Sequence, residues 1–313
     1  MSTKDDVIHI LMNTDRYVSG EVLARKLGKS RAAVWKAIRS LRQDGIAIDA
    51  VTNRGYRLVN DNDVLSASAV RSAVDYDTRV LYYPTIDSTN TQAKRLINDG
   101  DDGNLLLVAG EQTAGRGRQG KSFYSPAKTG VYLTYVAHPC APLQTVVGAT
   151  TAAAVAVCRA IEALTDIEPK IKWVNDVYVD GKKVCGILTE AITDFETQTV
   201  TSIIIGIGVN ITTTEFADSI ENAGCINCSI SRARLAAEIA NQLNKVNCAD
   251  LSPIIDYYRS HSMIIGEDIN YIRNGVVIPA RAVAIDSSGG LEVEHSDGSR
   301  AVLRSGEISV RKR

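Results

Sequence analysis

Residues 19–42 constrain the fold more than any other part of this sequence, because they show the pattern of a helix, a glycine turn and a second helix. Ser19 is a suitable N-cap for a short helix that ends near Leu27, and Gly28 supplies the turn. Ser30 then caps the second helix. The buried stripe of this second helix is expected at Val34, Ile38 and Leu41. Two helices joined in this way have the shape that fits a DNA major groove.

A first amphipathic helix is expected at 7–12, and a hairpin is expected after the helix pair. The apolar segments 46–50 and 56–59 flank a turn at 52–55, which predicts two short strands with Arg54 and Arg57 at or near their tip. A helix-turn-helix followed by a basic hairpin is a winged helix. We therefore expect a winged helix-turn-helix at the start of the chain.

The charge of the chain is unevenly distributed. Residues 1–60 carry eleven Lys and Arg against six Asp and Glu, whereas the whole chain has 35 basic and 36 acidic residues. A basic head on an acidic body indicates contact with a polyanion. The residues expected to contact DNA are Ser30, Arg31, Trp35, Lys36, Arg39 and Arg54. The alternative is a small helical module with a solvated basic face, which requires the hairpin, the Gly28 turn and the charge to coincide by accident.

Composition excludes several classes of protein. The chain is 45% hydrophobic and 23% charged, as globular proteins are and coiled coils or disordered chains are not. The longest apolar run, 146–158, is too short and too polar to cross a bilayer. The acidic start of the chain is unlike a signal peptide, and six Cys in 313 residues form no disulfide framework. We therefore expect a cytoplasmic protein without a membrane partner.

Apolar strand patterns alternate with helical patterns from about residue 65 to 251, which predicts a mixed α/β domain. The expected strands are 80–83, 105–110, 131–137, 171–173, 184–190 and 202–209. The expected helices are 89–98, 145–164, 232–244 and 254–260.

The segment 115–120 matches the dinucleotide-binding pattern G-x-G-x-x-G, but its context does not. In dinucleotide-binding proteins the glycines open a helix, whereas Lys121 to Pro126 is a poor helix start. What remains is a glycine-rich loop that carries Arg116, Arg118 and Lys121. Such a loop can close over an anionic ligand, because guanidinium groups bind phosphate and carboxylate well. A solvated surface loop is equally compatible with the local sequence.

Three further segments place polar groups at the ends of expected elements. They are 87–92, which starts a helix, 172–176, which lies around a strand end, and 181–190, which puts Lys183 at the start of an apolar strand. Each segment alone has an ordinary explanation as a helix cap, a hairpin turn or an edge-strand charge.

Together, and in this order, these segments resemble the family of bifunctional biotin–protein ligases and biotin-operon repressors. The motifs are Ser30-Arg31-Ala32-Ala33-Val34, Ser88-Thr89-Asn90, Gly115-Arg116-Gly117-Arg118-x-Gly120, Lys172-Trp173-x-Asn175-Asp176, Lys183-x-x-Gly186-Ile187-Leu188, Gly206-x-Gly208-x-Asn210 and Gly306-Glu307-Ile308-Ser309. The residues that depart from the commoner pattern are Gln119, Ser122, Phe123 and Val174. These departures leave the charged groups in place.

The resemblance implies an ATP-dependent ligase. Members of the family join biotin to ATP, which gives biotinyl-5′-adenylate and pyrophosphate. They then transfer the biotinyl group to one lysine of a biotin carboxyl-carrier domain of the acetyl-CoA carboxylase type. The biotin carboxylate and the α-phosphate are both anions, so bringing them together requires positive charge. We therefore expect Lys183, Arg116 and Arg118 to be catalytic, with Lys183 at the junction of the two anions.

The resemblance also implies which residues hold each substrate. Those expected to bind biotin are Ser88, Thr89, Asn90, Gln112, Gly115, Arg116, Gly117, Arg118, Lys183, Gly186, Leu188, Gly206 and Gly208. Those expected to bind ATP or the adenylate are Arg118, Lys121, Lys172, Asn175, Asp176 and Asn210. Mg²⁺ is expected to accompany ATP, with Asp176 as a ligand directly or through water. The pair Cys225 and Cys228 has no second pair nearby, so we expect no zinc site.

From Gly266 the pattern changes to short strands punctuated by turns, which predicts a small SH3-like barrel. The resemblance implies that this barrel binds ATP or contacts the carrier domain, and a purely structural cap on the central sheet is the alternative. The expected class is α+β. The expected domains are a winged helix-turn-helix at 1–60, a ligase domain at 66–265 and an SH3-like domain at 266–313.

A winged helix fused to an adenylating enzyme suggests feedback. We expect the adenylate to order the 115–120 loop and a second loop after Asn210, so that a homodimer forms and binds operator DNA of biotin synthesis genes. Three alternatives stay open: a lipoate-type ligase, a ligand-sensing winged-helix repressor without catalysis, and a ligase whose winged helix does not bind DNA. A repressor that only senses a neutral vitamin would not need so many cations in its pocket.

Overall fold

The computed structural model describes the chain at residues 3–12, 14, 16–43, 46–59, 63, 65–139, 141–142, 145–194, 196–197, 199–216, 222–246, 251–273, 275–304 and 308–310. Gly306 and Glu307 of the last motif, and residues 217–221 of the second loop, lie outside these ranges.

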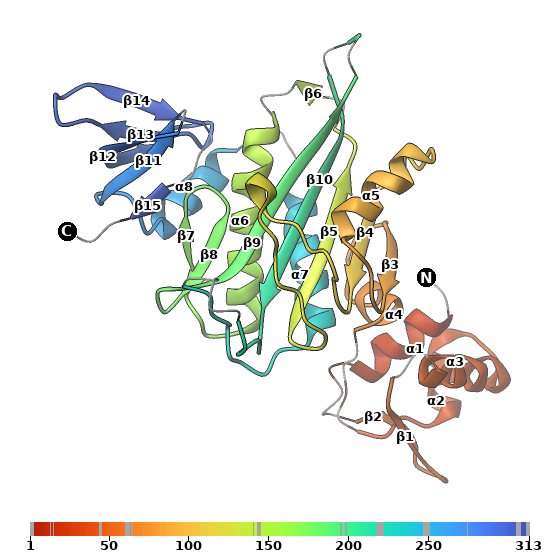
Figure 1. The fold of residues 1–313 in the computed structure, drawn as a ribbon. Helices are drawn as coiled ribbons and strands as arrows, with labels where there is room; N and C mark the ends of the chain where they lie inside the picture. Colours follow the sequence, from red (N-terminus) through yellow and green to blue (C-terminus); the bar gives the residue numbers. More distant parts are fainter. Residues whose placement is uncertain are drawn as a thin grey trace.

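Residues 3–59, here called the head, fold as a helix-turn-helix with a hairpin (Figure 1). The elements are α1 (Thr3–Met12), α2 (Gly20–Leu27), α3 (Arg31–Gln43), β1 (Ile48–Val51) and β2 (Gly55–Leu58). Ser19 Oγ accepts a hydrogen bond from the Val22 backbone N (3.2 Å), and Gly28 ends α2 in the left-handed region at φ 60°. These features are as predicted, but α1 begins at Thr3 and is longer than the apolar pattern indicated.

The central part of the chain is built on one mixed sheet. Its strands are β3 (Arg79–Tyr83), β4 (Leu105–Ala109), β5 (Gly130–Ala137), β6 (Ala141–Pro142), β7 (Lys170–Lys172), β8 (Asp176–Val179), β9 (Lys182–Thr193) and β10 (Thr199–Asn210). They lie in the order β3-β4-β5-β10-β9-β8-β7, with β6 beside β10. β3 and β4 pair in parallel, and the other described pairs are antiparallel.

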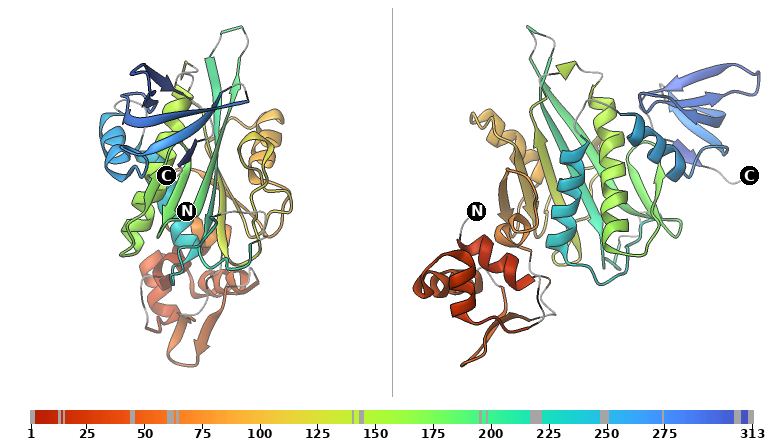
Figure 2. Two further views of the ribbon diagram at one scale, coloured as in Figure 1. Left: turned by 60° about the vertical axis from the view of Figure 1, so that its left-hand side comes forward. Right: turned by 180° about the vertical axis from the view of Figure 1, so that it is seen from behind.

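Two helices cover one face of this sheet, as the right-hand view of Figure 2 shows. They are α6 (Thr145–Leu164) and α7 (Arg232–Lys245), and both agree with the predicted helices to within a residue. α5 (Thr89–Asn98) packs on the opposite face, where its buried Ala93 belongs to a smaller apolar cluster with Leu107 and Ile204. α8 (Ser252–His261) follows α7 and packs against α6.

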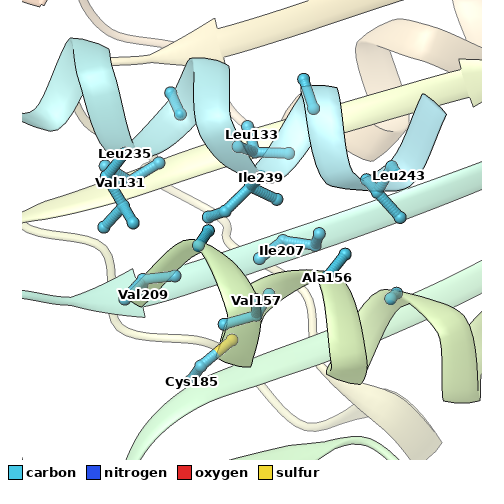
Figure 3. Close-up of a cluster of buried hydrophobic side chains, with 14 of the residues drawn as sticks. Val131, Leu133, Ala156, Val157, Cys185, Ile207, Val209, Leu235, Ile239 and Leu243 are labelled. Atoms are coloured by element: carbon cyan, nitrogen blue, oxygen red, sulfur yellow. The ribbon is translucent and has the colours of Figure 1, made fainter. Parts of the chain in front are cut away.

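The main core lies between the sheet and the pair α6 and α7 (Figure 3). The side chains drawn there are Val131, Leu133, Ala156, Val157, Cys185, Ile207, Val209, Leu235, Ile239 and Leu243. Burial of each Val, Leu or Ile side chain of this kind stabilises the fold by about 1.5–3 kcal/mol. The small side chains along α6 allow it to pack closely on the sheet.

Alternation along β9 and β10 decides which side chains face away from this core. Ile205, Ile207 and Val209 on β10 belong to the main core, so Gly206, Gly208 and Asn210 face the other side. The register pairs Gly206 with Leu188, and Gly208 with Gly186. The face of the sheet opposite α6 and α7 is therefore poor in side-chain volume at its centre.

Three short elements, one α-helix and two strands, were missed by the sequence patterns. α4 (Ala67–Arg71) is a five-residue helix that Ser66 caps, and β8 forms a hairpin with β7 across residues 173–175. β6 is a two-residue strand that pairs with β10. All three are too short to show a clear period. The expected strand at 171–173 ends one residue earlier, at Lys172.

The last described part of the chain is a five-stranded antiparallel sheet. Its strands are β11 (Asp268–Arg273), β12 (Val276–Ile285), β13 (Leu291–Glu294), β14 (Arg300–Leu303) and β15 (Ile308–Val310). Their order is β14-β13-β12-β11-β15, and among the described residues no pairing joins β14 to β15. The expected closed barrel is therefore not seen, and the sheet is open at these two strands.

Side-chain hydrogen bonds fasten both ends of the molecule to the central part. Trp173 Nε1 donates to the carbonyl of Gly289 (2.9 Å), which holds the turn before β13. Arg234 Nη2 on α7 donates to the carbonyl of Met12 at the end of α1 (2.8 Å). The head and the C-terminal sheet lie at opposite ends of the central sheet (Figures 1 and 2).

No helix among the described residues is long and apolar enough to cross a membrane. The described cysteines, Cys158, Cys185, Cys225 and Cys228, are free thiols. No group of three or more metal-ligating side chains occurs in the described part of the chain.

Gly55→Ala should destabilise the head more than Gly28→Ala does. Both glycines have positive φ, but a Cβ at Gly55 would collide with the Val18 backbone, whereas nothing lies within 4 Å of one at Gly28. We expect Gly28→Ala to cost about 1 kcal/mol of unfolding free energy and Gly55→Ala about 3 kcal/mol or more. Urea unfolding followed by circular dichroism measures both, and equal losses would contradict the steric argument.

Candidate functional site

One cavity of about 910 Å³ lies on the face of the central sheet opposite α6 and α7. It brings together residues that are far apart in the sequence and that the sequence patterns had singled out. Those that line it are Ser88, Thr89, Asn90, Gln112, Arg116, Gly117, Arg118, Lys121, Lys172, Asn175, Asp176, Lys183, Gly186, Leu188, Gly206, Gly208 and Asn210. Gly115 lies just behind this wall, where a Cβ would collide with the Phe123 carbonyl and approach Ser125 Oγ to 2.8 Å.

The start of α5 forms the polar end of the cavity. Ser88 caps the helix, since its Oγ accepts a hydrogen bond from the Thr91 backbone N (3.4 Å). Thr89 donates to Gln112 Oε1 from both its backbone N (2.9 Å) and its Oγ1 (3.1 Å). Gln112 Nε2 in turn donates to Ser125 Oγ (2.9 Å). These bonds hold neutral polar groups in fixed directions at one end of the cavity.

Asn90 is buried over the glycine face of the sheet. Thr134 Oγ1 donates to its Oδ1 (2.7 Å), and its Nδ2 donates to Glu190 Oε2 (3.0 Å). A Cβ at Gly206 would occupy the position of the Asn90 amide group. The glycine at this position of β10 therefore makes room for the amide.

Phe123 fills the remaining gap on this face. Its ring lies where a Cβ on Gly208 would collide, and 3.1 Å from where a Cβ on Gly186 would lie. The ring also packs edge-on against Tyr132, with centroids 6.5 Å apart. The sequence pattern identified Phe123 only as a departure, but the structure makes it the floor of the cavity.

The glycine-rich loop is tied across the cavity at two points. Arg118 Nη1, in the short 3-10 turn Arg118–Gly120, donates to Asn175 Oδ1 (2.9 Å). Arg116 Nη2 forms an ion pair with Glu190 Oε1 at 3.2 Å. No helix follows the loop, in agreement with the sequence argument against a dinucleotide fold. Both arginines line the cavity, and Arg116 remains exposed to solvent.

Glu190 is the important residue that sequence reasoning missed. It contacts Asn90, Lys94 and Arg116, and its carboxylate lies 2.7 Å from Lys94 Nζ. Burial alone would raise its pKa, but hydrogen bonds from Lys94 and Asn90 hold the pKa of Glu190 below its ordinary value of 4.5. The sequence carried one signal for Glu190, because it is an acidic residue in the apolar strand expected at 184–190.

Lys183 and Asp176 form the charged centre of the cavity. Lys183 Nζ lies 2.7 Å from Asp176 Oδ1, across the register that pairs β8 with β9. Lys172 points toward the ring of Tyr178, with Nζ 5.7 Å from its centroid. The described lining residues include five cations, namely Arg116, Arg118, Lys121, Lys172 and Lys183, and a single carboxylate, that of Asp176. Such an excess of positive charge suits a ligand with more than one anionic group.

A magnesium ion is compatible with this centre only together with a ligand. Asp176 Oδ1 is buried and accepts no hydrogen bond of good geometry from the described residues, despite its ion pair with Lys183. Mg²⁺ is commonly bound by one or two carboxylates plus substrate phosphates. The donor set thus fits an ion carried by a phosphate ligand and not a metal site made by the protein alone.

The head presents a second candidate surface, along α3 and the hairpin. Arg31, Lys36 and Arg39 are exposed, and Trp35 is 54% exposed with the Arg39 guanidinium 5.6 Å from its ring centroid. Ser30 Oγ accepts from the Ala33 backbone N (3.1 Å), so this residue caps α3. The other predicted DNA contact, Arg54, is exposed on the turn between β1 and β2. Four of the predicted contacts thus share the exposed surface of α3.

Three family models match the chain. Residues 3–57 match the HTH domain, residues 82–210 match the Biotin/lipoate A/B protein ligase family, and residues 264–311 match the Biotin protein ligase C terminal domain. Among curated relatives, the bifunctional ligase/repressor BirA of Bacillus subtilis is 32% identical and covers 96% of each chain. That of Escherichia coli is 28% identical over 96% of this chain and 95% of its own length.

Solved structures are similar to about three quarters of the chain. A biotin protein ligase from Aquifex aeolicus, solved in complex with biotin and ATP, matches with a TM-score of 0.62 and 26% sequence identity. The match covers 75% of this chain and 99% of that one.

Glu190→Gln should lower the melting temperature at neutral pH, because it removes the charge that Lys94 and Arg116 neutralise. The folded-state pKa of Glu190 is below its unfolded value, so its contribution is complete above about pH 4.5 and is lost as pH falls through the folded value. The difference in melting temperature between wild type and variant should therefore shrink below that pH. A difference that stays constant under acid conditions would contradict this role.

Proposed function

The chain belongs to the family of bifunctional biotin–protein ligases and repressors, and from this membership we propose how its cavity joins biotin to ATP and passes the biotinyl group to a carrier lysine. The observation that carries the proposal is that five cations and one carboxylate are among the described residues that line the cavity, beside a neutral polar wall. Biotin and ATP together require a cavity with one neutral side and one positively charged side, because biotin has a neutral ureido end and an anionic tail.

The first step joins two anions. A carboxylate oxygen of biotin attacks the α-phosphorus of ATP, the bond to the β-phosphate oxygen breaks, and pyrophosphate leaves. Lys183 lies where the carboxylate and α-phosphate would meet, and its ammonium group exchanges Asp176 for the reacting oxygens. Arg116 and Arg118 close over the same anions from the loop. Preorganised charge of this kind lowers the barrier without any covalent enzyme intermediate.

The neutral wall is suited to the ureido end of biotin. Thr89, Gln112 and Asn90 hold their polar groups through bonds to the protein, so ligand binding does not have to order them. Ser88 places its own backbone at the same end of the cavity. The channel for the apolar ring and tail of biotin is enclosed by Gly186, Leu188, Gly206 and Gly208. The ring of Phe123 lies over these glycines and shifts to fit the ligand.

The nucleotide is assigned to the side of the cavity formed by β7, β8 and the end of β10. Asn210 Oδ1 is buried and accepts no hydrogen bond from the described residues, which leaves an acceptor for a ribose hydroxyl. Asn175 and Lys172 border the same space. Asp176 would hold the Mg²⁺ that accompanies ATP, and the ion would supply positive charge to the phosphates. In the second step the amine of the carrier lysine attacks the acyl carbon and AMP leaves.

We assign the C-terminal sheet one of two roles: it closes the cavity over the nucleotide, or it contacts the carrier domain. Ile272 on β11 lines the cavity although it belongs to this sheet, and Val276 and Val277 beyond it are 59% and 55% exposed. The register of β12 shifts between Ala282 and Ala284, and because such bulges bend strands, this shift supports the proposal of an SH3-like domain. The domain division at 1–60, 66–265 and 266–313 is part of the proposal, and the grouping of the elements supports it.

The head is the repressor part of the molecule. We assign α3 to the major groove of operator DNA, and a homodimer formed by the adenylate-bound protein would present two such helices about 34 Å or a multiple of that apart. The dimer, the operator of biotin synthesis genes and a cytoplasmic location all belong to the proposal. The cations that line the cavity favour a repressor that is also a ligase over a repressor that only senses the neutral vitamin.

Lys183→Ala should lower adenylate formation by about 10²–10³-fold, the scale for loss of one preorganised electrostatic contact. Lys182→Ala is the matched control, because Lys182 is an exposed neighbour on the same strand that does not line the cavity. Single-turnover release of pyrophosphate from ATP and biotin measures the rate. A Lys183→Ala rate within threefold of wild type would remove Lys183 from this role, and equal rates with lipoate and biotin would favour the lipoate alternative.

Biotin and ATP together should shift the protein from monomer to dimer. The adenylate is expected to order the 115–120 loop and the loop after Asn210, and so to complete the contact surface. Sedimentation velocity with and without the two substrates measures the monomer fraction, and Lys183→Ala serves as a control that makes little adenylate. An unchanged monomer fraction in wild type would reject the coupling.

A further inference from the structure

One carboxylate oxygen beside the cavity is shared by two cations. Glu190 Oε1 lies 2.7 Å from Lys94 Nζ on α5 and 3.2 Å from Arg116 Nη2 on the glycine-rich loop. The other oxygen, Oε2, accepts a hydrogen bond from Asn90 Nδ2 (3.0 Å). Lys94 belongs to none of the sequence motifs and is not among the described residues that line the cavity. Its contact with the partner of a loop arginine therefore needs an explanation of its own.

The strand β9 places Glu190 away from the charged centre of the cavity. Gly186, which pairs with Asp176 on β8, lies on the same face of β9 as Glu190, because the two are separated by an even number of residues. Four residues of strand span about 13 Å. Pairing with Glu190 therefore holds the Arg116 guanidinium group toward the end of the cavity that is remote from Lys183 and Asp176.

The glycine-rich loop is a small hairpin with one tie at each end of the cavity. Arg116 pairs with Ser122 across the loop in an antiparallel bridge. Arg118 ties the loop to Asn175, and Arg116 ties it to Glu190. Because backbone pairing joins the two sides of the loop, release of Arg116 frees the loop at that end.

Lys94 and Arg116 compete for the same negative charge. Burial raises the pKa of Glu190, but the hydrogen bonds from Lys94 and Asn90 outweigh burial and keep the pKa below its ordinary value, so the carboxylate is charged at neutral pH. An oxygen that already accepts from one cation attracts a second one less strongly, and the two cations repel each other. The side chains of Lys94 and Arg116 are 36% and 46% exposed, so water can solvate either one when it leaves. Lys94 therefore weakens the hold of Glu190 on Arg116.

We propose that Lys94 is a positioning residue for adenylate formation, which acts through Glu190 to make Arg116 and its loop easy to release. The proposal rests on the proposed function, in which Arg116 meets the anionic groups of biotin and ATP. Arg116 has to leave Glu190 to reach them, and Lys94 stays behind to neutralise the carboxylate. Without Lys94, that departure would leave a mostly buried carboxylate with the Asn90 amide as its one remaining partner among the described residues. Such a carboxylate is costly, so Arg116 would stay.

Lys94→Met tests the proposal, because it removes the competing charge and keeps the apolar stem of the side chain. Trypsin can cut the loop after Arg116, Arg118 and Lys121, and cutting requires the loop to open; fragment masses identify these cuts. We expect the loop of the variant to be cut about three- to fivefold more slowly, the scale of one partly exposed ion pair. The kcat/KM for biotin in pyrophosphate release should fall by a similar factor. Lys94→Arg keeps the charge and should behave as the wild type does.

A double-mutant comparison separates this route from a general effect on folding. Glu190→Gln removes the shared charge, so it should speed cutting of the loop by itself. In that background Lys94→Met should change neither the cutting rate nor kcat/KM. Lys245→Met is the matched control, because Lys245 is an exposed lysine of another helix, α7, and pairs with Asp75 at 3.7 Å away from the lining of the cavity. It should keep the wild-type values.

The outcomes distinguish this proposal from the function on which it rests. If the wild-type chain releases no pyrophosphate, the proposed function is wrong, and the cutting rates alone decide whether Lys94 loosens the loop. If the wild type is active but Lys94→Met leaves the cutting rate and kcat/KM unchanged, the role of Lys94 is wrong while the proposed function stands. If the effects of Lys94→Met persist in the Glu190→Gln background, Lys94 acts by another route and the proposal is overturned.

Discussion

The antiparallel pairing of β9 with β10 is the constraint on which the rest of the structure depends. The alternating residues of these strands bury Ile205, Ile207 and Val209 under α6 and α7, and the same alternation turns glycines toward the opposite face. A shift of one residue in the register would put the glycines into the core and the isoleucines into the cavity. The fold and the site are therefore fixed by one set of backbone hydrogen bonds. The glycines serve as space for Asn90 and Phe123, and not as flexible hinges.

Electrostatics determines what this space can hold. Five cations line the cavity, where Lys183 pairs with Asp176 and Arg116 pairs with Glu190. Bringing like charges together costs free energy, which anionic substrates recover when they bind. The pairs Lys183–Asp176 and Arg116–Glu190 hold the cations in place until substrates arrive.

Much of this could be predicted from the sequence because local signals agreed with the fold. Ser19, Gly28 and Ser30 mark helix ends through their own backbone preferences, and α5 and α6 have strong periods. Most of the cavity lining could be predicted because the motif residues lie at strand and helix ends. Glu190, Phe123 and the Trp173–Gly289 bond could not, since each depends on contacts between segments far apart in the chain. The SH3-like barrel was expected from short strands punctuated by turns and from the family resemblance, but closure depends on a pairing of β14 with β15 that the described residues do not show.

The most direct test of the account is transfer of labelled biotin by the purified wild-type chain to a biotin carboxyl-carrier domain, with pyrophosphate release followed in the same reaction. The account predicts that label appears on the carrier, that pyrophosphate is released in equal amount, and that both need ATP. A chain that releases no pyrophosphate and labels no carrier when supplied with saturating biotin, ATP and Mg²⁺ would contradict it.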